Sequence, residues 1–194
     1  MISTANPLLL ASTSHYRKEL LARLGLPFEV VAPGTDETPQ PGEAPAALAR
    51  RLARAKAQDV AARYPGRWVL GSDQVPAFDG RVLGKPGNRE AGVAQLRACS
   101  GKAVAFHTAA ALVAGAAVHE HLDTTTVRFR ELTAAEIARY LDAEPAYDCA
   151  GTFKVEGLGI TLFEAIDSTD PTALIGLPLI GVRRLLAQAG YGLP

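Results

Sequence analysis

The sequence predicts an α/β protein of the mixed, α+β kind, with parallel and antiparallel strands in one sheet. Its 194 residues are 48% hydrophobic and 21% charged, which is typical of a folded domain with a substantial core and excludes intrinsic disorder. Strand-like apolar runs alternate with helical patterns along the chain. A long β region from Lys102 to Arg130, with its turn at Ala114–Ala117, argues against an all-parallel sheet.

The first elements are a buried strand, a capped helix and a second strand. Pro7–Ala11 is wholly apolar, as in a buried strand. Ser14 is placed to cap a helix over Tyr16–Leu24, and Gly25 supplies the stop. Phe28–Val31 predicts the second strand.

A proline- and glycine-rich loop, Ala32–Pro45, leads into the middle of the chain. Ala46–Tyr64 has the Ala/Arg/Leu composition of a long helix, which a Pro-Gly pair ends. Arg67–Val75 predicts a third, buried strand, with Trp68 packed in or beside it. Asp79-Gly80 then suits a type I′ hairpin turn.

Three further helices complete the prediction. The first is expected near Glu90–Cys99, before the long β region. Thr133 caps the second, which runs to Leu141, and Leu177-Pro178 opens the last, which runs to Ala189.

Composition and charge argue against several functional classes of protein. Lys+Arg and Asp+Glu both count 20, and this neutral balance argues against a general nucleic-acid binder while leaving room for a small phosphorylated ligand. No apolar run approaches the roughly 20 residues of a membrane span, and no signal-peptide pattern is present. We expect a cytoplasmic protein whose Cys99 and Cys149 are reduced and buried, although one disulfide is formally open.

Two polar clusters lie near the N-terminus. Ser12-Thr13-Ser14-His15-Tyr16-Arg17-Lys18 lies between a strand and a helix, where free N–H groups and the helix dipole bind anions. The alternative is a capped helix start with solvated basic residues. Thr35-Asp36-Glu37-Thr38 offers loop carboxylates that could ligate Mg²⁺, or that are merely solvated. Lys56 lies in a basic helical run, which is weak evidence alone.

Two more clusters follow. Asp73 ends a buried apolar strand, a placement suited to a general base or metal ligand. The hairpin could return Lys85 to its side, either for catalysis or as a structural ion pair. The glycine-rich stretch from Cys149 to Gly159 carries one cation, Lys154, and one anion, Glu156, where a backbone could approach a ligand. The three histidines of the β region lack zinc-ligand spacing and are expected to pack structurally.

Taken in order, these segments resemble the Maf family of nucleoside triphosphate pyrophosphatases from Leu8 to about Gly190. The matching segments are Ser12-x-Ser14-x-x-Arg17-Lys18, Asp36-Glu37-Thr38, Lys56-Ala57, Ser72-Asp73-Gln74-Val75, Gly84-Lys85-Pro86, Ala150-Gly151 and Gly176-Leu177-Pro178-Leu179. The resemblance implies a Maf/inosine-triphosphatase-like fold, with residues 1–194 forming one domain of two lobes around a central cleft.

The resemblance also implies an activity, a metal-dependent attack of water on the α-phosphate of a nucleotide that releases diphosphate. By position, Asp73 matches the proton acceptor, and Glu37 with Asp73 matches the acids that hold Mg²⁺, Mn²⁺ or Co²⁺. The remaining matches surround the triphosphate: Arg17, Lys56 and Lys85 as catalytic cations, and Ser12, Ser14, Lys18 and Lys154 as substrate-binding groups.

Within the family, the sequence looks most similar to the subgroup that converts 7-methyl-GTP to 7-methyl-GMP, which would remove modified nucleotides. Tyr16, Gln74 and Glu156 match the positions that bear on base choice. An aromatic ring can stack on the cationic methylated base, and a carboxylate suits the N–H donors of guanine. The alternatives are a dTTP/UTP pyrophosphatase and a nucleotide-binding regulator of cell division with weak hydrolysis. A homodimer is left open.

Overall fold

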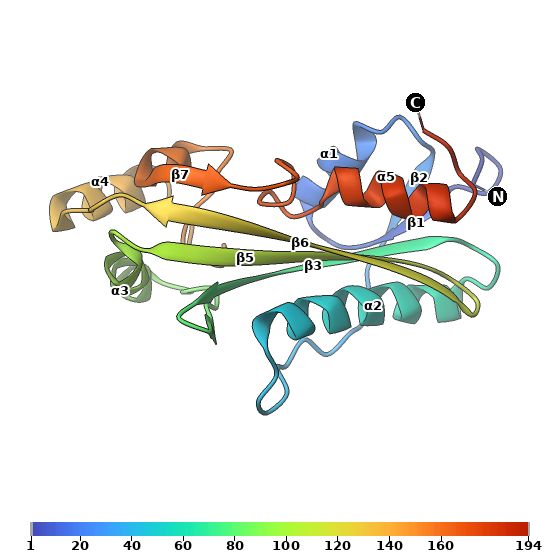
Figure 1. Ribbon diagram of the computed structural model, residues 1–194, viewed down its shortest axis with the longest axis horizontal. Coiled ribbons are helices and arrows are strands. Elements are labelled where there is room, and N and C mark those ends of the chain that lie inside the picture. Colours follow the sequence, from blue (N-terminus) through green and yellow to red (C-terminus); the bar gives the residue numbers. More distant parts are fainter. Residues whose placement is uncertain (1, 194) are drawn as a thin grey trace.

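The computed structural model describes residues 2–193, and its centre is one seven-stranded mixed sheet with helices on both faces (Figure 1). The strands are β1 (Leu8–Ala11), β2 (Phe28–Val31), β3 (Val69–Phe78), β4 (Arg81–Val82), β5 (Ala103–Ala114), β6 (Ala117–Phe129) and β7 (Phe163–Asp167). The helices are α1 (His15–Ala22), α2 (Pro45–Arg63), α3 (Arg89–Cys99), α4 (Ala134–Ala143) and α5 (Leu179–Gln188), with a 3₁₀ helix, η1 (Leu158–Leu162).

The sheet combines a parallel part with an antiparallel part. Its order is β2-β1-β3-β5-β6-β7, and β4 pairs with the end of β3. β1 is parallel to β2 and β3, whereas β5, β6 and β7 continue the sheet antiparallel. The long β5–β6 hairpin closes where Ala114 pairs with Ala117. The predicted mixed sheet and its turn are therefore confirmed.

One edge of β3 is unpaired along its middle. β1 pairs with β3 only as far as Gly71, and β4 pairs with it again from Ala77. No described strand pairs with residues 72–76 on that side. Pro76, which has no N–H to donate, is tolerated in this segment for that reason. The carboxyl end of β1 thus lies beside an opening in the sheet, the kind of place where α/β sheets bind ligands.

Two cores lie on opposite faces of the sheet. Because successive strand residues point to opposite sides, Leu8 and Leu10 pack with α1 and α5, whereas Leu9 and Ala11 pack with α2. A third core, rich in phenylalanine, lies at the other end of the sheet with α3 and α4. Its edge-to-face ring pairs include Phe129 and Phe163, with centroids 5.0 Å apart.

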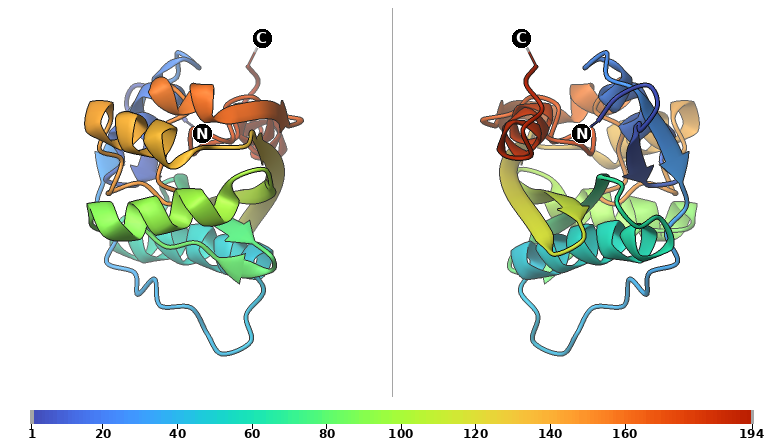
Figure 2. Two further views of the ribbon diagram at one scale, coloured as in Figure 1. Left: turned by 90° about the vertical axis from the view of Figure 1, so that its left-hand side faces the viewer. Right: turned by 90° about the vertical axis from the view of Figure 1, so that its right-hand side faces the viewer.

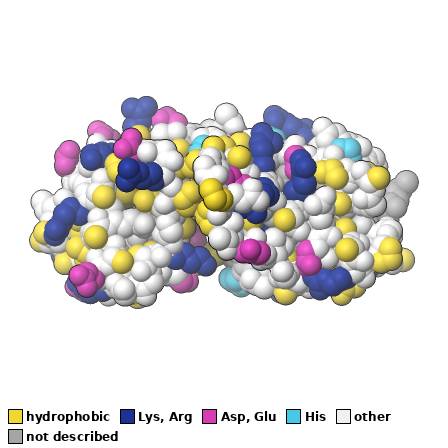
Figure 3. Space-filling view, turned by 90° about the horizontal axis from the view of Figure 1, so that it is seen from below, with side chains coloured by type: hydrophobic (Ala, Val, Ile, Leu, Met, Phe, Trp, Pro, Cys, Tyr) yellow, Lys and Arg dark blue, Asp and Glu magenta, His cyan; other side chains and the backbone are white. Residues whose placement is uncertain are grey.

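The molecule is elongated, and β5 and β6 run along its length (Figure 1). We call the end with α1, α2 and α5 the first lobe and the end with α3, α4 and β7 the second lobe. Figure 2 shows the loop between β2 and α2 projecting from the body. Seen from below, the molecule narrows between the lobes, and acidic and basic side chains are interspersed over both (Figure 3).

Most predicted elements are confirmed, with ends displaced by one to three residues. Ser14 and Thr133 cap α1 and α4, and Asp79 and Gly80 both have positive φ, as a type I′ turn requires. The third strand continues to Phe78 rather than ending at Val75, because its unpaired edge accommodates Pro76. The sequence did not predict β7 or η1.

The remaining aromatic, histidine and cysteine predictions are mostly confirmed. Trp68 lies just before β3 and stacks on His119 with ring centroids 5.8 Å apart. His107 shares a 3.0 Å hydrogen bond with Thr124. Cys99 and Cys149 are both free thiols, but only Cys99 is buried.

In the part of the chain that the structure describes, no helix is both long and apolar enough to cross a membrane.

Candidate active site

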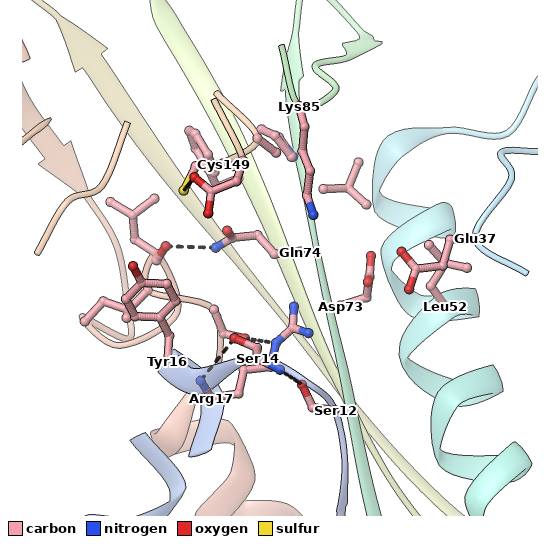
Figure 4. Close-up of a pocket in the computed structure, with 18 of the residues that line it drawn as sticks. Ser12, Ser14, Tyr16, Arg17, Glu37, Leu52, Asp73, Gln74, Lys85 and Cys149 are labelled. Carbon is pink, nitrogen blue, oxygen red and sulfur yellow. Dashed lines mark hydrogen bonds between the residues drawn. The ribbon is translucent and has the colours of Figure 1, made fainter. Parts of the chain in front are cut away.

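A cavity of about 740 Å³ opens beside the unpaired edge of β3 and receives residues from both lobes. With the exception of Lys18, every residue predicted for the site lines it: Ser12, Ser14, Tyr16, Arg17, Glu37, Lys56, Asp73, Gln74, Lys85, Lys154 and Glu156. Figure 4 shows Asp73 and Glu37 at one end of this cavity and Tyr16 and Cys149 at the other. We call these the acidic end and the aromatic end.

Lys56 joins two carboxylates at the acidic end. Its Nζ lies 2.6 Å from Asp73 Oδ1 and 2.7 Å from Glu37 Oε1. Asp73 comes from β3, Lys56 from the middle of α2, and Glu37 from the projecting loop. Because Lys56 and Asp73 are only 5% and 6% exposed, the Asp73 carboxylate depends on Lys56 for neutralisation, whereas Lys56 is neutralised by both Asp73 and Glu37.

Burial has the largest effect on the Asp73 carboxyl. Removal from water raises its pKa, and the positive charges of Lys56 and Arg17 oppose that rise only in part. The nearby charge of Glu37 raises the pKa further. A carboxylate whose proton affinity is raised in a cleft is better suited to accept a proton from water than one in solvent.

The turn between β1 and α1 forms the floor of the cavity. Ser12 Oγ accepts a 3.1 Å hydrogen bond from the backbone N–H of Ser14. Ser14 Oγ accepts one of 3.4 Å from the N–H of Arg17, as a helix N-cap does. The start of α1 therefore faces the cavity, and its dipole favours an anion there.

The side chain of Arg17 is hydrogen-bonded to the segment that precedes α5. Its Nε donates a 2.9 Å hydrogen bond to the carbonyl of Gly176. The same carbonyl lies 3.1 Å from Ser72 Oγ, whose single hydrogen it shares with the carbonyl of Ala109 at 2.8 Å. Burial lowers the pKa of the guanidinium, and the charges of Asp73 and Glu37 oppose that shift. Arg17 is thus a half-buried, oriented cation that faces two acids.

Gln74 has a structural role that the sequence did not indicate. Its amide nitrogen lies 2.9 Å from the carbonyl oxygens of Ala173 and Leu174 and 3.1 Å from Thr108 Oγ1. Since an amide NH₂ has two hydrogens, these acceptors account for its donor capacity. Only the carbonyl oxygen of the Gln74 side chain has capacity left for a ligand.

Charged groups gather around Tyr16 at the aromatic end. Burial raises the pKa of the Tyr16 hydroxyl, and the charge of Lys154 opposes this rise while that of Glu156 adds to it. Lys154 Nζ lies 3.8 Å from Asp148 Oδ1. Burial also raises the pKa of the Cys149 thiol to about 11, so this thiol is neutral at physiological pH. Lys154 therefore lies with Tyr16, not with Lys56 and Asp73.

Lys85 reaches the cavity from the loop after β4, and Figure 4 shows its amine pointing toward Asp73. The structural ion pair considered between Lys85 and Asp73 is absent among the described residues, because Lys56 takes that place. Lys85 is exposed, which leaves its charge available to a ligand.

Two features of the site depart from the sequence prediction. Lys18, on α1, is exposed and does not line the cavity, because a helical residue next to Arg17 points in another direction. Gly176, noted only as part of a motif, is the residue whose carbonyl holds Arg17 and Ser72. Its φ of 126° is one that residues with a side chain rarely adopt.

The described residues contain no group of three or more His, Cys, Asp or Glu side chains that could hold a metal ion. The site offers two carboxylates, Asp73 and Glu37, and both contact the amine of Lys56. Two carboxylates are nevertheless what Mg²⁺ commonly takes from a protein when phosphate oxygens and water complete its coordination. The donor set therefore fits a divalent ion that arrives together with a phosphorylated ligand.

Comparison with known proteins gives close relatives over nearly the whole chain. One named 7-methyl-GTP pyrophosphatase, from Xanthomonas oryzae pv. oryzae (strain MAFF 311018), is 61% identical over 187 residues, covering 96% of this chain and 98% of the relative. Another of that name, from Bordetella pertussis (strain Tohama I), is 55% identical over 183 residues, covering 94% of this chain and 92% of its own.

A solved structure, the Staphylococcus aureus Ham1 protein, aligns with 63% of this chain and 71% of its own at a TM-score of 0.45 and 14% identity.

The family comparison agrees with the Xanthomonas and Bordetella relatives. Residues 7–189 match the family described as Maf-like protein, a range that includes every residue lining the cavity. The chain belongs to the Maf family.

Proposed function

We propose that this protein is a nucleoside triphosphate pyrophosphatase that hydrolyses 7-methyl-GTP to 7-methyl-GMP and diphosphate. The observation that carries the proposal is the polarity of one cavity: a buried carboxylate with cations at the acidic end, and a tyrosine with carboxylates at the aromatic end. The name shared by relatives from Xanthomonas and Bordetella supports the same substrate. The reaction would take place in the cytoplasm and remove its substrate from the nucleotide pool there.

Asp73 acts as the proton acceptor in this proposal. Its raised pKa increases the affinity of the carboxylate for the proton of an attacking water. Lys56 holds Asp73 in place with a 2.6 Å contact and is positioned to meet negative charge that develops on the phosphate. When Asp73 takes the proton, the positive charge of Lys56 remains to compensate Glu37 at 2.7 Å.

The triphosphate lies across the floor of the cavity. Backbone N–H groups at the start of α1, together with Arg17, bind its oxygens, and exposed Lys85 adds a positive charge from the opposite wall. A divalent cation held by Glu37 and Asp73 would neutralise phosphate charge and polarise the reacting phosphorus centre. Ser12 and Ser14 keep the turn in the shape that exposes these donors.

The base occupies the aromatic end. A 7-methylguanine ring carries a positive charge, which favours stacking on Tyr16 and proximity to Glu156. Glu156 can accept from the N–H donors of guanine, whereas a thymine offers a single N–H between two carbonyls. The donor capacity of the Gln74 side chain is already used by the chain, so Gln74 acts on base choice through the wall that it holds.

The experiment is diphosphate release from 7-methyl-GTP, GTP, dTTP, UTP and CTP with Mg²⁺, Mn²⁺ or Co²⁺. We expect 7-methyl-GTP to give the highest kcat/KM and Asp73→Asn to lower it at least 100-fold. Asp79→Asn, an exposed turn residue, is the matched control. A preference for dTTP or UTP would show that the protein is a dTTP/UTP pyrophosphatase instead. Nucleotide binding without release of diphosphate would favour a nucleotide-binding regulator.

Selectivity is tested separately at Glu156. Replacing its carboxylate by the amide in Glu156→Gln is expected to reduce the preference for 7-methyl-GTP over dTTP about tenfold, because charge and acceptor capacity are lost together. Glu164→Gln, an exposed change on β7, should leave the ratio unaltered. An unchanged ratio in Glu156→Gln would reject the base contact.

A further inference from the structure

The segment that supports the back wall of the cavity, residues 168–180, is organised around a buried carboxylate. Asp170 is 2% exposed. Its Oδ1 accepts hydrogen bonds from the backbone N–H and the hydroxyl of Thr172, at 3.0 and 2.6 Å. Its Oδ2 accepts a 2.7 Å hydrogen bond from the N–H of Ile180 in the first turn of α5. Asp170 therefore ties the beginning of the segment to the helix at its end.

Thr172 provides a second set of hydrogen bonds between the beginning and the end of this segment. Its hydroxyl donates to Asp170 and lies 2.9 Å from the carbonyl of Leu177, and it accepts a 2.9 Å hydrogen bond from the N–H of Leu179. A single side-chain oxygen thus contacts both ends of a turn. We call the turn between them, residues 173–176, the carbonyl turn.

The carbonyl turn presents its oxygen atoms to site residues. The carbonyls of Ala173 and Leu174 accept from Gln74, and the carbonyl of Gly176 accepts from Arg17. Each of these donors comes from another part of the sequence, so hydrogen bonds to the turn link the side chain of Arg17 on α1 to the middle of β3. A shift of its backbone would therefore move Arg17 and Gln74 together.

We propose that Asp170 and Thr172 are positioning residues, which act on the triphosphate and base through the carbonyl turn. The inference rests on the proposed nucleotide pyrophosphatase function. Arg17 has its Nε committed to Gly176, and this bond directs its two terminal nitrogens toward the cavity. A guanidinium that is oriented before the ligand arrives loses less entropy on binding phosphate.

The central variant is Thr172→Val, which keeps the shape of the side chain and removes its hydrogen bonds. We expect KM for 7-methyl-GTP, and the dissociation constant of its non-hydrolysable α,β-methylene analogue, to rise about tenfold, with a smaller change in kcat. Thr172→Ser retains the hydroxyl and should restore both values to within about twofold. Thr161→Val, which removes an exposed hydroxyl bonded to Leu158 in η1, is the matched control.

A double-mutant cycle with Arg17→Gln separates positioning from general stability. If Thr172 acts through Arg17, Thr172→Val should weaken binding of the analogue far less in the Arg17→Gln background than in the wild type. Equal losses in both backgrounds would overturn the inference. So would a Thr172→Val protein that unfolds at lower temperature while its KM and analogue affinity stay at wild-type values.

Gly176→Ala provides a second route if Thr172→Val does not fold. The added methyl has room, since its nearest neighbour is Arg17 Nε at 3.7 Å, but the φ of 126° is strained for alanine and the carbonyl must turn. The same rise in KM is expected, and an unchanged KM would reject the carbonyl turn as a positioning element. Failure of the wild type to hydrolyse or bind any nucleotide would instead reject the proposed function and this inference with it.

Discussion

At the scale of single residues, the site depends on a charge arrangement that is costly to bury. Asp73 and Lys56 are almost fully enclosed, and a buried ion pair adds little net stability because both partners lose their hydration. The favourable contact between them therefore serves the site more than the fold. Its consequences can be measured through pH.

The first consequence concerns activity. A proton acceptor works only when it is ionised, and burial raises the pKa of Asp73 above its usual 3.8. We expect kcat/KM to increase with pH through an acid limb that lies above the range of a solvent-exposed aspartate. In Lys56→Gln the limb should move to still higher pH, because the nearby positive charge that lowers this pKa is removed.

The measurement is the pH profile of kcat/KM for both proteins, with Lys102→Gln, an exposed lysine, as the matched control. A wild-type limb at the ordinary aspartate value would contradict the role of Asp73 as the proton acceptor. A limb that stays in place in Lys56→Gln would contradict the electrostatic coupling.

The second consequence concerns stability. A carboxyl whose pKa is higher in the folded state than in the unfolded state contributes stability below the unfolded value and loses it as pH rises through the folded value. Ionised Asp73 therefore costs stability at neutral pH. Because Glu37 at 2.7 Å still neutralises Lys56 in the variant, we expect Asp73→Asn to unfold at the same or a higher temperature than the wild type at pH 7.5 despite its lost activity. A clearly lower unfolding temperature would show that the ion pair stabilises the fold.

At the scale of elements, the distance between Lys56 and Asp73 is set by the contact of α2 with β3. Gly71 lies at this contact: a Cβ there would stand 2.2 Å from the carbonyl oxygen of Ala53 and 2.7 Å from the backbone nitrogen of Ala57. The helix can therefore lie on the strand only where the strand has no side chain. Close packing of these two elements brings the amine to the carboxylate.

Gly71→Ala should separate α2 from β3 and destabilise the protein by about 1–3 kcal/mol, the usual cost of overpacking a core. The value of kcat/KM should fall by more than the loss of stability explains, because the methyl group is added two residues from Asp73. Denaturant unfolding and kcat/KM provide the two readouts. Gly192→Ala, where a Cβ meets nothing within 4 Å, is the matched control and should behave as the wild type.

The start of α4 provides a pH-dependent element far from the site. The N–H and hydroxyl of Thr133 and the guanidinium of Arg130 lower the pKa of Glu136 from 4.5 to about 2. A carboxyl with a lowered folded-state pKa contributes stability above its unfolded value and loses it as pH falls toward its folded value. Thermal unfolding between pH 5 and 2 should therefore fall more steeply in the wild type than in Glu136→Gln. Parallel curves would contradict this.

At the scale of the whole molecule, β5 and β6 connect the two lobes mechanically. On β5, Val104 and Phe106 belong to the core of the second lobe, whereas Ala110 and Leu112 belong to a core of the first. One continuous strand thus contributes to cores at both ends. The lobes cannot separate without breaking the β5–β6 ladder.

We therefore expect one cooperative unfolding transition, in keeping with the single domain that the sequence predicts. Chemical denaturation followed by Trp68 fluorescence reports the first lobe, and far-UV circular dichroism reports the whole chain. The two curves should coincide. Two separated transitions would mean that the lobes are independent folding units.

Much of this organisation could be predicted from the sequence. Local features can be recognised from the sequence because they depend on neighbouring residues. They include the apolar run before Ser12, the capping residues Ser14 and Thr133 and the turn residues Asp79 and Gly80. Strand extension past Pro76 could not be predicted, because it depends on which edge of the strand is left unpaired. β7 could not be predicted for a similar reason, because it forms by pairing with β6, which is distant in the sequence.

For the site, the sequence by itself determined which chemical groups are available. The residue types alone identify Asp73, Lys56, Arg17 and Glu37 as an acid, two cations and a loop carboxylate. Only the tertiary structure decided how they are used: that Lys56, rather than Lys85, pairs with Asp73, and that Lys18 points away.

The physical reason is the range of the interactions involved. Helix capping and turns involve neighbours in the chain, whereas a buried ion pair joins residues from separate elements and depends on how closely those elements pack. The contact at Gly71 and the carbonyl turn before α5 act across long sequence separations. The sequence therefore determined the chemistry, and packing decided which groups face one another.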